Sequence, residues 1–286
     1  MGVRDRFGAR GFGARCMGVL AALTLLAPAT AYASAHAADG SERARSAPVA
    51  SEPPGPDTDS PQGLATYLGE AFSSIDGYWQ DYFRAHRLEG PSVFYATPLS
   101  SEDSFTSRCA EQPVTHDTPT FFYCAADGYT TREGDTLSGG IYFPVTTAMG
   151  LRRETGDFAL ATVMAHEFGH EVQQELMEQL HLRDIVQMKD GAPVLENGRP
   201  VKVKESELLA DCYSGNWSKY AHRQGLVATA NLAEAVVALR LAADKEFGVG
   251  DPHGSKYERT AAFTLGYTSG DPLRCAHRYW VTETWE

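Results

Sequence analysis

The 286-residue sequence is short of basic residues and contains no C-x-x-C pair. Without such a pair, a zinc site built mainly from cysteines is disfavoured. The formal net charge is −12, so the basic face that a nucleic-acid-binding protein needs is not expected. No internal repeat is visible, and no segment beyond the N-terminal region is apolar over a length that could span a bilayer. The sequence is therefore expected to form one main globular domain of ordinary composition.

The N-terminal region is typical of an exported protein. A basic stretch over 1–16 precedes an apolar stretch over 17–35 that ends in small residues, as in a secretory signal peptide. An uncleaved membrane anchor is the alternative, which the small-residue tail disfavours. The following Ser- and Pro-rich residues predict a flexible linker. We therefore expect a signal peptide (1–37), a linker (38–62) and a secreted or cell-surface domain (63–286).

Five cysteines are present, and Cys16 falls within the expected signal peptide. The other four form an even number, which suits two disulfides in an exported protein. Three pairings are open, and we favour Cys109–Cys124 together with Cys212–Cys275. Four reduced thiols are the alternative.

The stretch 161–177 contains the pattern H-E-x-x-H at His166, Glu167 and His170. On a helix the two histidines lie one turn apart on one face, so both rings can bind one metal ion. Glu167 can then reach a water on the metal without binding the metal itself. Such short patterns also arise by chance, so a core helix with two incidental histidines is the alternative. Because glycine weakens a helix, Gly169 predicts a close approach of another backbone or a substrate.

A second pattern, Glu207-x-x-x-Asp211, places two carboxylates on one face of a later helix. Glu207 would be the third metal ligand and would leave the fourth position for water. Asp211 would hydrogen-bond the far ring nitrogen of a ligand histidine and fix its tautomer. Apolar neighbours favour this over two solvated surface acids, and Glu205 is a weaker candidate. A metzincin pattern is excluded because Gln173 and Leu176 replace its glycine and third histidine.

Hydrophobic periodicity predicts several helices and a few short strands. The expected helices cover 63–88, about 156–181, 205–224, 231–245 and 255–267, and the expected strands cover 93–95, 121–124 and 140–143. Turn signals predict a small β excursion within 183–203. The expected fold class is α+β, predominantly helical, with a zincin-like catalytic domain and a small β-sheet next to the H-E-x-x-H helix. One strand edge there could align an extended peptide, and an ordinary sheet strand is the alternative.

Several motifs occur in a characteristic order: FYCAAD (122–127), GDFA (156–159), HEFGHEVQ (166–173), ELLADCYSG (207–215), HGS (253–255) and the stretch 266–275. Together they resemble the bacterial neutral zinc metallopeptidases over roughly residues 105–280. The resemblance implies a gluzincin, with Zn²⁺, a helical ligand scaffold, Glu167 as general base and Glu207 as third ligand. The turn-rich stretch 183–203 and the tail after Cys275 depart from the family pattern.

A peptidase also needs a donor to the oxyanion of the tetrahedral intermediate. His253 is the leading candidate because it lies in a matching motif, with Tyr257 and Tyr213 as alternatives. A simple helix-start role is the other interpretation of His253. Arg259 could bind a substrate carboxylate or pair with an acid, and we favour the pairing.

The expected function is that of a secreted zinc metallopeptidase acting on a peptide or protein substrate. With Zn²⁺ held by His166, His170 and Glu207, the carboxylate of Glu167 would take a proton from water and later pass it to the leaving amine. No nucleic-acid partner and no membrane span in the mature chain are expected. A non-catalytic, zinc-stabilised binding protein at the cell surface and a cell-wall peptide amidase are the alternatives.

Overall fold

The computed structural model describes most of the chain from residue 59 onward. The described residues are 59–132, 134, 136–189, 192–196, 199–200, 203–243 and 253–280. They belong to one compact unit, Glu52–Glu286. The expected signal peptide and the expected linker up to residue 58 lie outside the described residues, so both stay predictions.

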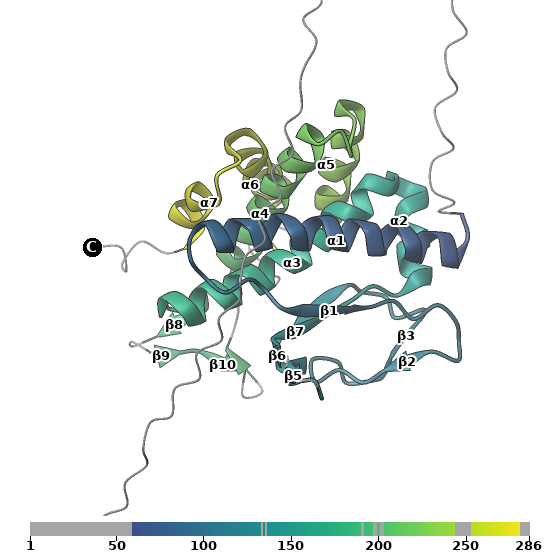
Figure 1. Cartoon of the computed structure of the whole chain (residues 1–286), viewed down its shortest axis with the longest axis horizontal. Coiled ribbons are helices and arrows are strands. Elements are labelled where there is room, and N and C mark those ends of the chain that lie inside the picture. Colours follow the sequence, from purple (N-terminus) through teal and green to yellow (C-terminus); the bar gives the residue numbers. More distant parts are fainter. Residues whose placement is uncertain are drawn as a thin grey trace, which may run out of the picture. The chain divides into compact units, whose positions relative to one another are not determined.

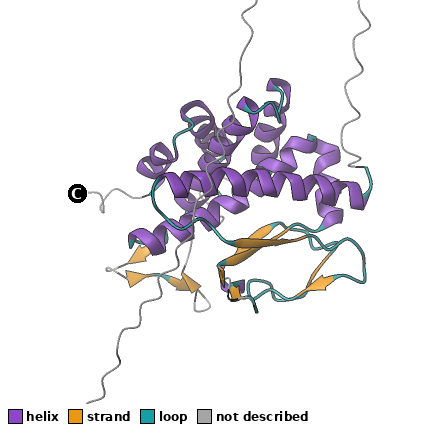
Figure 2. Cartoon of the chain, viewed as in Figure 1, coloured by secondary structure: helices purple, strands orange, loops and turns teal. Residues whose placement is uncertain are grey.

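Helices make up most of the described structure, and the strands lie along one side of them (Figures 1 and 2). Within the described ranges, no helix combines the length and the apolar composition that crossing a membrane would need. The helices are α1 (Pro61–Ala85), α2 (Val145–Thr155), α3 (Asp157–Leu180), α4 (Lys204–Arg223), α5 (Leu232–Leu241), α6 (Lys256–Ser269) and α7 (Pro272–Tyr279), with short 3-10 turns η1 (Ala125–Asp127) and η2 (Thr229–Asn231).

The strands are short and form several small sheets. They are β1 (Val93–Ala96), β2 (Ser104–Phe105), β3 (Val114–Thr115), β4 (Phe122–Cys124), β5 (Tyr129–Thr130), β6 (Thr136–Leu137), β7 (Gly139–Tyr142), β8 (Met188–Lys189), β9 (Ala192–Pro193), β10 (Leu195–Glu196) and β11 (Arg199–Pro200).

The structure confirms the expected α+β, predominantly helical fold. α1, α3, α4, α5 and α6 match the predicted helices, and β1, β4 and β7 match the predicted strands, within a few residues at each end. The β excursion predicted within 183–203 is present as the pairs β8–β9 and β10–β11. α2 and α7 were not expected, because α2 buries only three of its side chains and α7 is only eight residues long.

α1 shows why its residues form a buried helix. The side chain of Ser60 caps its start by accepting a hydrogen bond from the backbone N–H of Gly63 at 3.1 Å. Apolar residues recur at helical spacing, and Leu68, Ile75 and Trp79 in this stripe are fully buried. The aromatic residues of α1 therefore belong to the core or pack against it, and each fully buried one stabilises the fold by about 1.5–3 kcal/mol.

The sheet beside α3 has the strand order β1-β7-β4. β1 runs parallel to β7, and β4 runs antiparallel to it, with Tyr123 opposite Ile141. β4 is therefore an edge strand of this sheet. The buried carboxylate of Glu171 on α3 fixes the sheet to the helix, because it accepts hydrogen bonds from the Tyr123 hydroxyl and the Ser138 hydroxyl. This contact places the edge strand along the helix that carries the histidines.

α3 and α4 cross in close contact at Gly169. A Cβ atom on Gly169 would lie 3.0 Å from the Cα atom and 3.1 Å from the carbonyl oxygen of Ala210. The sequence left open whether a backbone or a substrate comes close to Gly169, and the structure shows that it is the backbone of α4. The missing side chain thus allows the two helices that bear the candidate ligands to approach each other.

Two disulfides crosslink the domain, and their pairing is the one favoured from the sequence. Cys109–Cys124 joins the segment after β2 to the end of β4, with Cα atoms 5.8 Å apart. Cys212–Cys275 joins α4 to α7, with Cα atoms 5.7 Å apart and a sequence separation of 63 residues. A crosslink closing so long a loop restricts the unfolded chain strongly, which stabilises the folded state.

The crossing at Gly169 generates a stability prediction. Gly169→Ala should lower the free energy of unfolding by about 1–3 kcal/mol, because the rigid backbone at Ala210 must move to admit the new methyl group. Gly150→Ala in α2 is the matched control, since nothing lies within 4 Å of its Cβ position. That change should stabilise the protein by about 0.5–1 kcal/mol. Urea unfolding followed by circular dichroism measures both, and equal effects would contradict the close crossing.

Candidate metal centre

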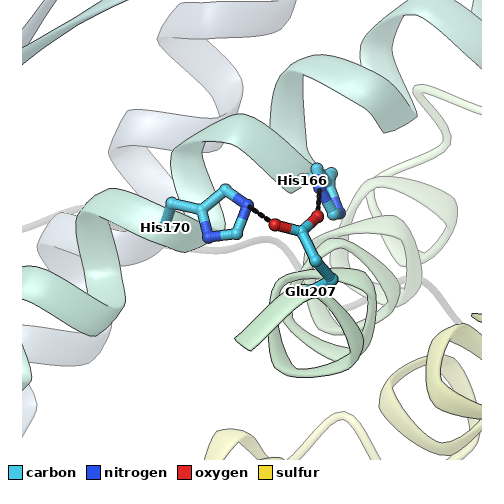
Figure 3. A group of neighbouring side chains, drawn as sticks. All are labelled: His166, His170 and Glu207. Carbon is cyan, nitrogen blue, oxygen red and sulfur yellow. Dashed lines mark hydrogen bonds and ion pairs between the residues drawn. The ribbon is translucent and has the colours of Figure 1, made fainter. Parts of the chain in front are cut away.

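Three buried side chains from α3 and α4 converge on one point (Figure 3). His166 and His170 lie one turn apart on α3, with ring centroids 4.9 Å apart. Glu207 projects from the first turn of α4 between the two rings. Its Oε2 lies 3.2 Å from Nε2 of His166, and its Oε1 lies 3.4 Å from Nε2 of His170. The structure thus brings together the three residues that the sequence predicted as ligands.

The donor set fits a zinc ion. One potential ligand atom from each side chain lies within 4.8 Å of the others, and two imidazoles with one carboxylate are a donor set typical of catalytic zinc. Burial alone would raise the pKa of Glu207, yet the two histidines hold it well below its usual range. The carboxylate is therefore ionised and directed at the place where a cation would be held.

Asp211 orients His166 from the side away from Glu207. The ring Nδ1–H of His166 donates to Oδ1 of Asp211 at 2.8 Å, which leaves Nε2 directed at Glu207. Burial alone would lower the pKa of His166, but the carboxylates of Asp211 and Glu207 raise it to about 9. The two carboxylates therefore favour a positive charge at the His166 ring. A metal ion that binds Nε2 of this ring would have to displace the proton held there. Asp211 occupies the position that the sequence predicted for it.

Arg259 completes this buried group of charges. Its Nε and Nη2 donate to the two carboxylate oxygens of Asp211, each at 2.8 Å, and its Nη1 donates to the carbonyl oxygen of Ala242 at 2.8 Å. Burial would raise the pKa of Asp211, but the guanidinium of Arg259 and the ring of His166 lower it. Of the two roles considered for Arg259, the structure shows the pairing with an acid.

Glu167 faces the same cleft without joining the three converging donors. Its Oε2 accepts a hydrogen bond from the backbone N–H of Tyr123 on β4 at 2.9 Å. The edge strand thus fixes the orientation of the candidate general base. The sequence could not single out Tyr123 for this contact, because every residue other than proline carries a backbone N–H group.

The cleft above the three donors has a volume of about 380 Å³ and is lined by β4 and by parts of α3, α4 and α5. His253 lies on this lining with Glu167 and Arg259, so it can approach a bound molecule. The two alternatives to His253 lie elsewhere. Tyr213 is fully buried with its ring centroid 5.1 Å from that of Trp79, and Tyr257 is 89% exposed.

The charge group around Asp211 generates a second prediction. Arg259→Met should lower the free energy of unfolding by about 3–5 kcal/mol, because it leaves a buried carboxylate without its partner. Replacing Asp211 as well, in the double variant Asp211→Asn/Arg259→Met, should recover part of that loss. Chemical denaturation of both variants measures the coupling. Single-variant losses below about 1 kcal/mol would contradict a tightly coupled buried pair.

Comparison with known proteins identifies the family. The family described as "Putative neutral zinc metallopeptidase" matches residues 59–277. "Uncharacterized protein YpfJ" of Escherichia coli K12 is 33% identical over 163 residues, which cover 54% of this chain and 52% of that protein. "Uncharacterized protein Rv2575" of Mycobacterium tuberculosis H37Rv is 31% identical over 139 residues, which cover 42% and 44%.

The chain spans about half the length of these curated relatives. No solved structure matches it. The family match covers most of the chain and includes His166, His170 and Glu207 with the helices that carry them. This protein belongs to the family described as "Putative neutral zinc metallopeptidase".

Proposed function

We propose that this protein is a secreted, zinc-dependent metallopeptidase that hydrolyses peptide bonds in a peptide or protein substrate. The observation that carries the proposal is the carboxylate of Glu167, which faces the same cleft as the three converging donors. A purely structural zinc site usually has four protein ligands and needs no additional carboxylate beside it. Among the residues that the structure describes, three donors converge here, which would leave a position for a reacting molecule.

His166, His170 and Glu207 would hold the metal. A zinc ion bound there supplies Lewis acidity, which lowers the pKa of water and polarises a carbonyl group. The buried Asp211–Arg259 pair keeps His166 in one orientation and one tautomer. These contacts hold the ring of His166 in place before any ligand binds.

Glu167 would act as the general base. Tyr123 already donates its backbone N–H to Oε2 of Glu167, so Oε1 is the oxygen left to take the proton from the attacking water. The same carboxylate would then deliver that proton to the leaving amine nitrogen. His253 on the lining of the cleft would donate a hydrogen bond to the developing oxyanion.

The edge of β4 would align the substrate. Residues 119–123 line the cleft, and β4 pairs with another strand of its sheet on one side only. An extended peptide can add to such an edge through main-chain hydrogen bonds, and antiparallel pairing is slightly more stable than parallel pairing. The substrate would then run opposite to β4, with its amino-terminal half toward Cys124.

Two features support export from the cytoplasm. The N-terminal sequence has the organisation of a signal peptide, and the domain contains two disulfides. Disulfides persist in oxidising compartments outside the cytoplasm. Both features fit a peptidase that acts outside the cell or at its surface.

Metal content tests the ligand assignment. The purified domain should contain about one zinc per chain by elemental mass spectrometry, since three protein ligands with one open position form a catalytic zinc site. Glu207→Ala should lose most of that zinc because it removes one of the three donors. Glu205→Ala, which changes the same residue type two positions away, should retain it. Zinc retained without Glu207 would place the third ligand elsewhere.

Turnover tests the role of Glu167. Glu167→Gln should keep its zinc and its circular dichroism spectrum but lose about 10²–10⁴-fold in kcat, because an amide cannot accept the proton from water. Cleavage of unfolded protein substrates, with products identified by mass spectrometry, provides the assay. A fully active Glu167→Gln protein would refute the mechanism. Release of cell-wall peptides without any protein cleavage would favour an amidase, and zinc binding without hydrolysis would favour a binding protein.

A further inference from the structure

A second hollow, with a volume of about 470 Å³, continues the cleft of the metal centre. The two hollows share His170 and Tyr123 on their linings. Along α3 the metal-centre cleft is lined from Val163 to His170, and the second hollow continues the lining to Met177. At the rise of an α-helix, this stretch of α3 is about 21 Å long.

β4 follows the same course as α3. Residues 119–123 line the metal-centre cleft, and residues 123, 125 and 126 line the second hollow. Residue numbers therefore increase from the first hollow to the second along α3 and also along the segment that contains β4. The two hollows therefore form one groove, with the metal centre in one half and the second hollow beyond the end of the edge strand. We name the second hollow the Met177 pocket.

The walls of the Met177 pocket are mainly apolar. Met177, Ile185, Val186 and Trp280 contribute, and the indole N–H of Trp280 donates to the carbonyl oxygen of Arg183 at 2.9 Å, which fixes the ring. Such walls are suited to the methylene groups of a long side chain.

Two polar residues on the lining already satisfy each other. The amide of Gln173 donates to the carbonyl oxygen of Ser206 at 2.9 Å, and the hydroxyl of Ser206 donates to Oε1 of Gln173 at 2.9 Å. Their hydrogen-bonding capacity is therefore largely used within the fold. They leave the charge of the pocket to be set by another residue.

That charge comes from Asp184, which contributes the pocket's acidic side chain. Asp184 is exposed, and it makes no hydrogen bond or ion pair within the part of the chain that the structure describes. A carboxylate beside an apolar wall complements a side chain with an apolar stem and a positively charged end. Lysine and arginine have this form.

We infer that the Met177 pocket receives a lysine or arginine side chain of the substrate, on the amino-terminal side of the scissile bond. This inference rests on the proposed peptidase function. A peptide antiparallel to β4 has its amino-terminal residues near Cys124 and Ala125, which is where the pocket lies. The apolar wall binds the stem of the side chain, and Asp184 pairs with its charge.

The size of the expected selectivity follows from the exposure of Asp184. An ion pair at an exposed site increases affinity by only about two- to five-fold. A peptide with lysine in the pocket should therefore bind more tightly, by about that factor, than one with methionine, which has a similar unbranched stem. A peptide with glutamate should bind more weakly than the methionine peptide by a similar factor, because like charges repel. The affinity for the lysine peptide should then exceed that for the glutamate peptide by roughly ten-fold.

The test uses sets of three peptides that carry lysine, methionine or glutamate at one position and are otherwise identical. In successive sets this position lies at each of three sites before the scissile bond. The first measurement is kcat/KM for the zinc-loaded protein, with cleavage sites mapped by mass spectrometry. The second is the Kd of the same peptides, labelled for fluorescence anisotropy, for the Glu167→Gln protein. Asp184→Asn should make lysine and methionine equivalent in both measurements. Asp184→Lys should make glutamate the preferred residue.

Glu111→Gln is the matched control. It removes the same charge two residues from Cys109, but it does not line the pocket, so the lysine preference should persist. Cleavage by the wild type with equal rates for the three peptides would overturn the pocket assignment and leave the proposed function standing. A lysine preference only after the scissile bond, or one that Asp184→Asn leaves intact, would also overturn it.

The binding measurement separates the two proposals. Failure of the wild type to cleave any peptide, together with an Asp184-dependent lysine preference in Kd, would reject the peptidase function and support the pocket as a binding site for basic peptides. Neither cleavage nor selective binding would overturn both.

Discussion

The close crossing of α3 and α4 at Gly169 is the constraint on which the rest of the site depends. A side chain at Gly169 would meet the backbone of Ala210 at 3.0 Å, so only glycine lets the helices approach this far without a shift. On either side of the crossing, one turn of α3 presents His166 and His170, while one turn of α4 presents Glu207. The three donor atoms converge because two rigid helices are locked at this distance, and no flexible loop takes part.

This arrangement requires charged groups in the protein interior, where they are costly unless paired. Asp211 is fully buried, and it is compensated on one side by the ring of His166 and on the other by the guanidinium of Arg259. Arg259 reaches the group from α6, which packs closely against α4 and begins with the capping box of Ser255 and Glu258. The orientation of one candidate ligand histidine, His166, thus depends on contacts among three helices.

Much of the site could be predicted because its signals are local in the sequence. The helical spacing of His166 and His170, and that of Glu207 and Asp211, fixes which side chains share a face, whatever the tertiary fold. The contacts that could not be predicted join segments far apart in the chain. The backbone N–H of Tyr123 donates to Glu167, which lies 44 residues later in the chain. Because the contact uses the backbone, it does not restrict which residue stands at position 123. α2 escaped prediction because it buries only three side chains and so lacks a strong apolar stripe.

The helices and the small sheet have different roles at the site. The helices hold the donor atoms rigidly, and the edge strand β4 supplies a surface along which an extended chain can lie. For the proposed hydrolysis the two parts must keep a fixed distance, since a water and the carbonyl that it attacks have to lie about 3–3.5 Å apart in an aligned geometry. Tyr123 provides that link twice, through its backbone to Glu167 and through its hydroxyl to Glu171. A peptide aligned on β4, as proposed above, would therefore be placed by the same residue that orients the candidate general base Glu167.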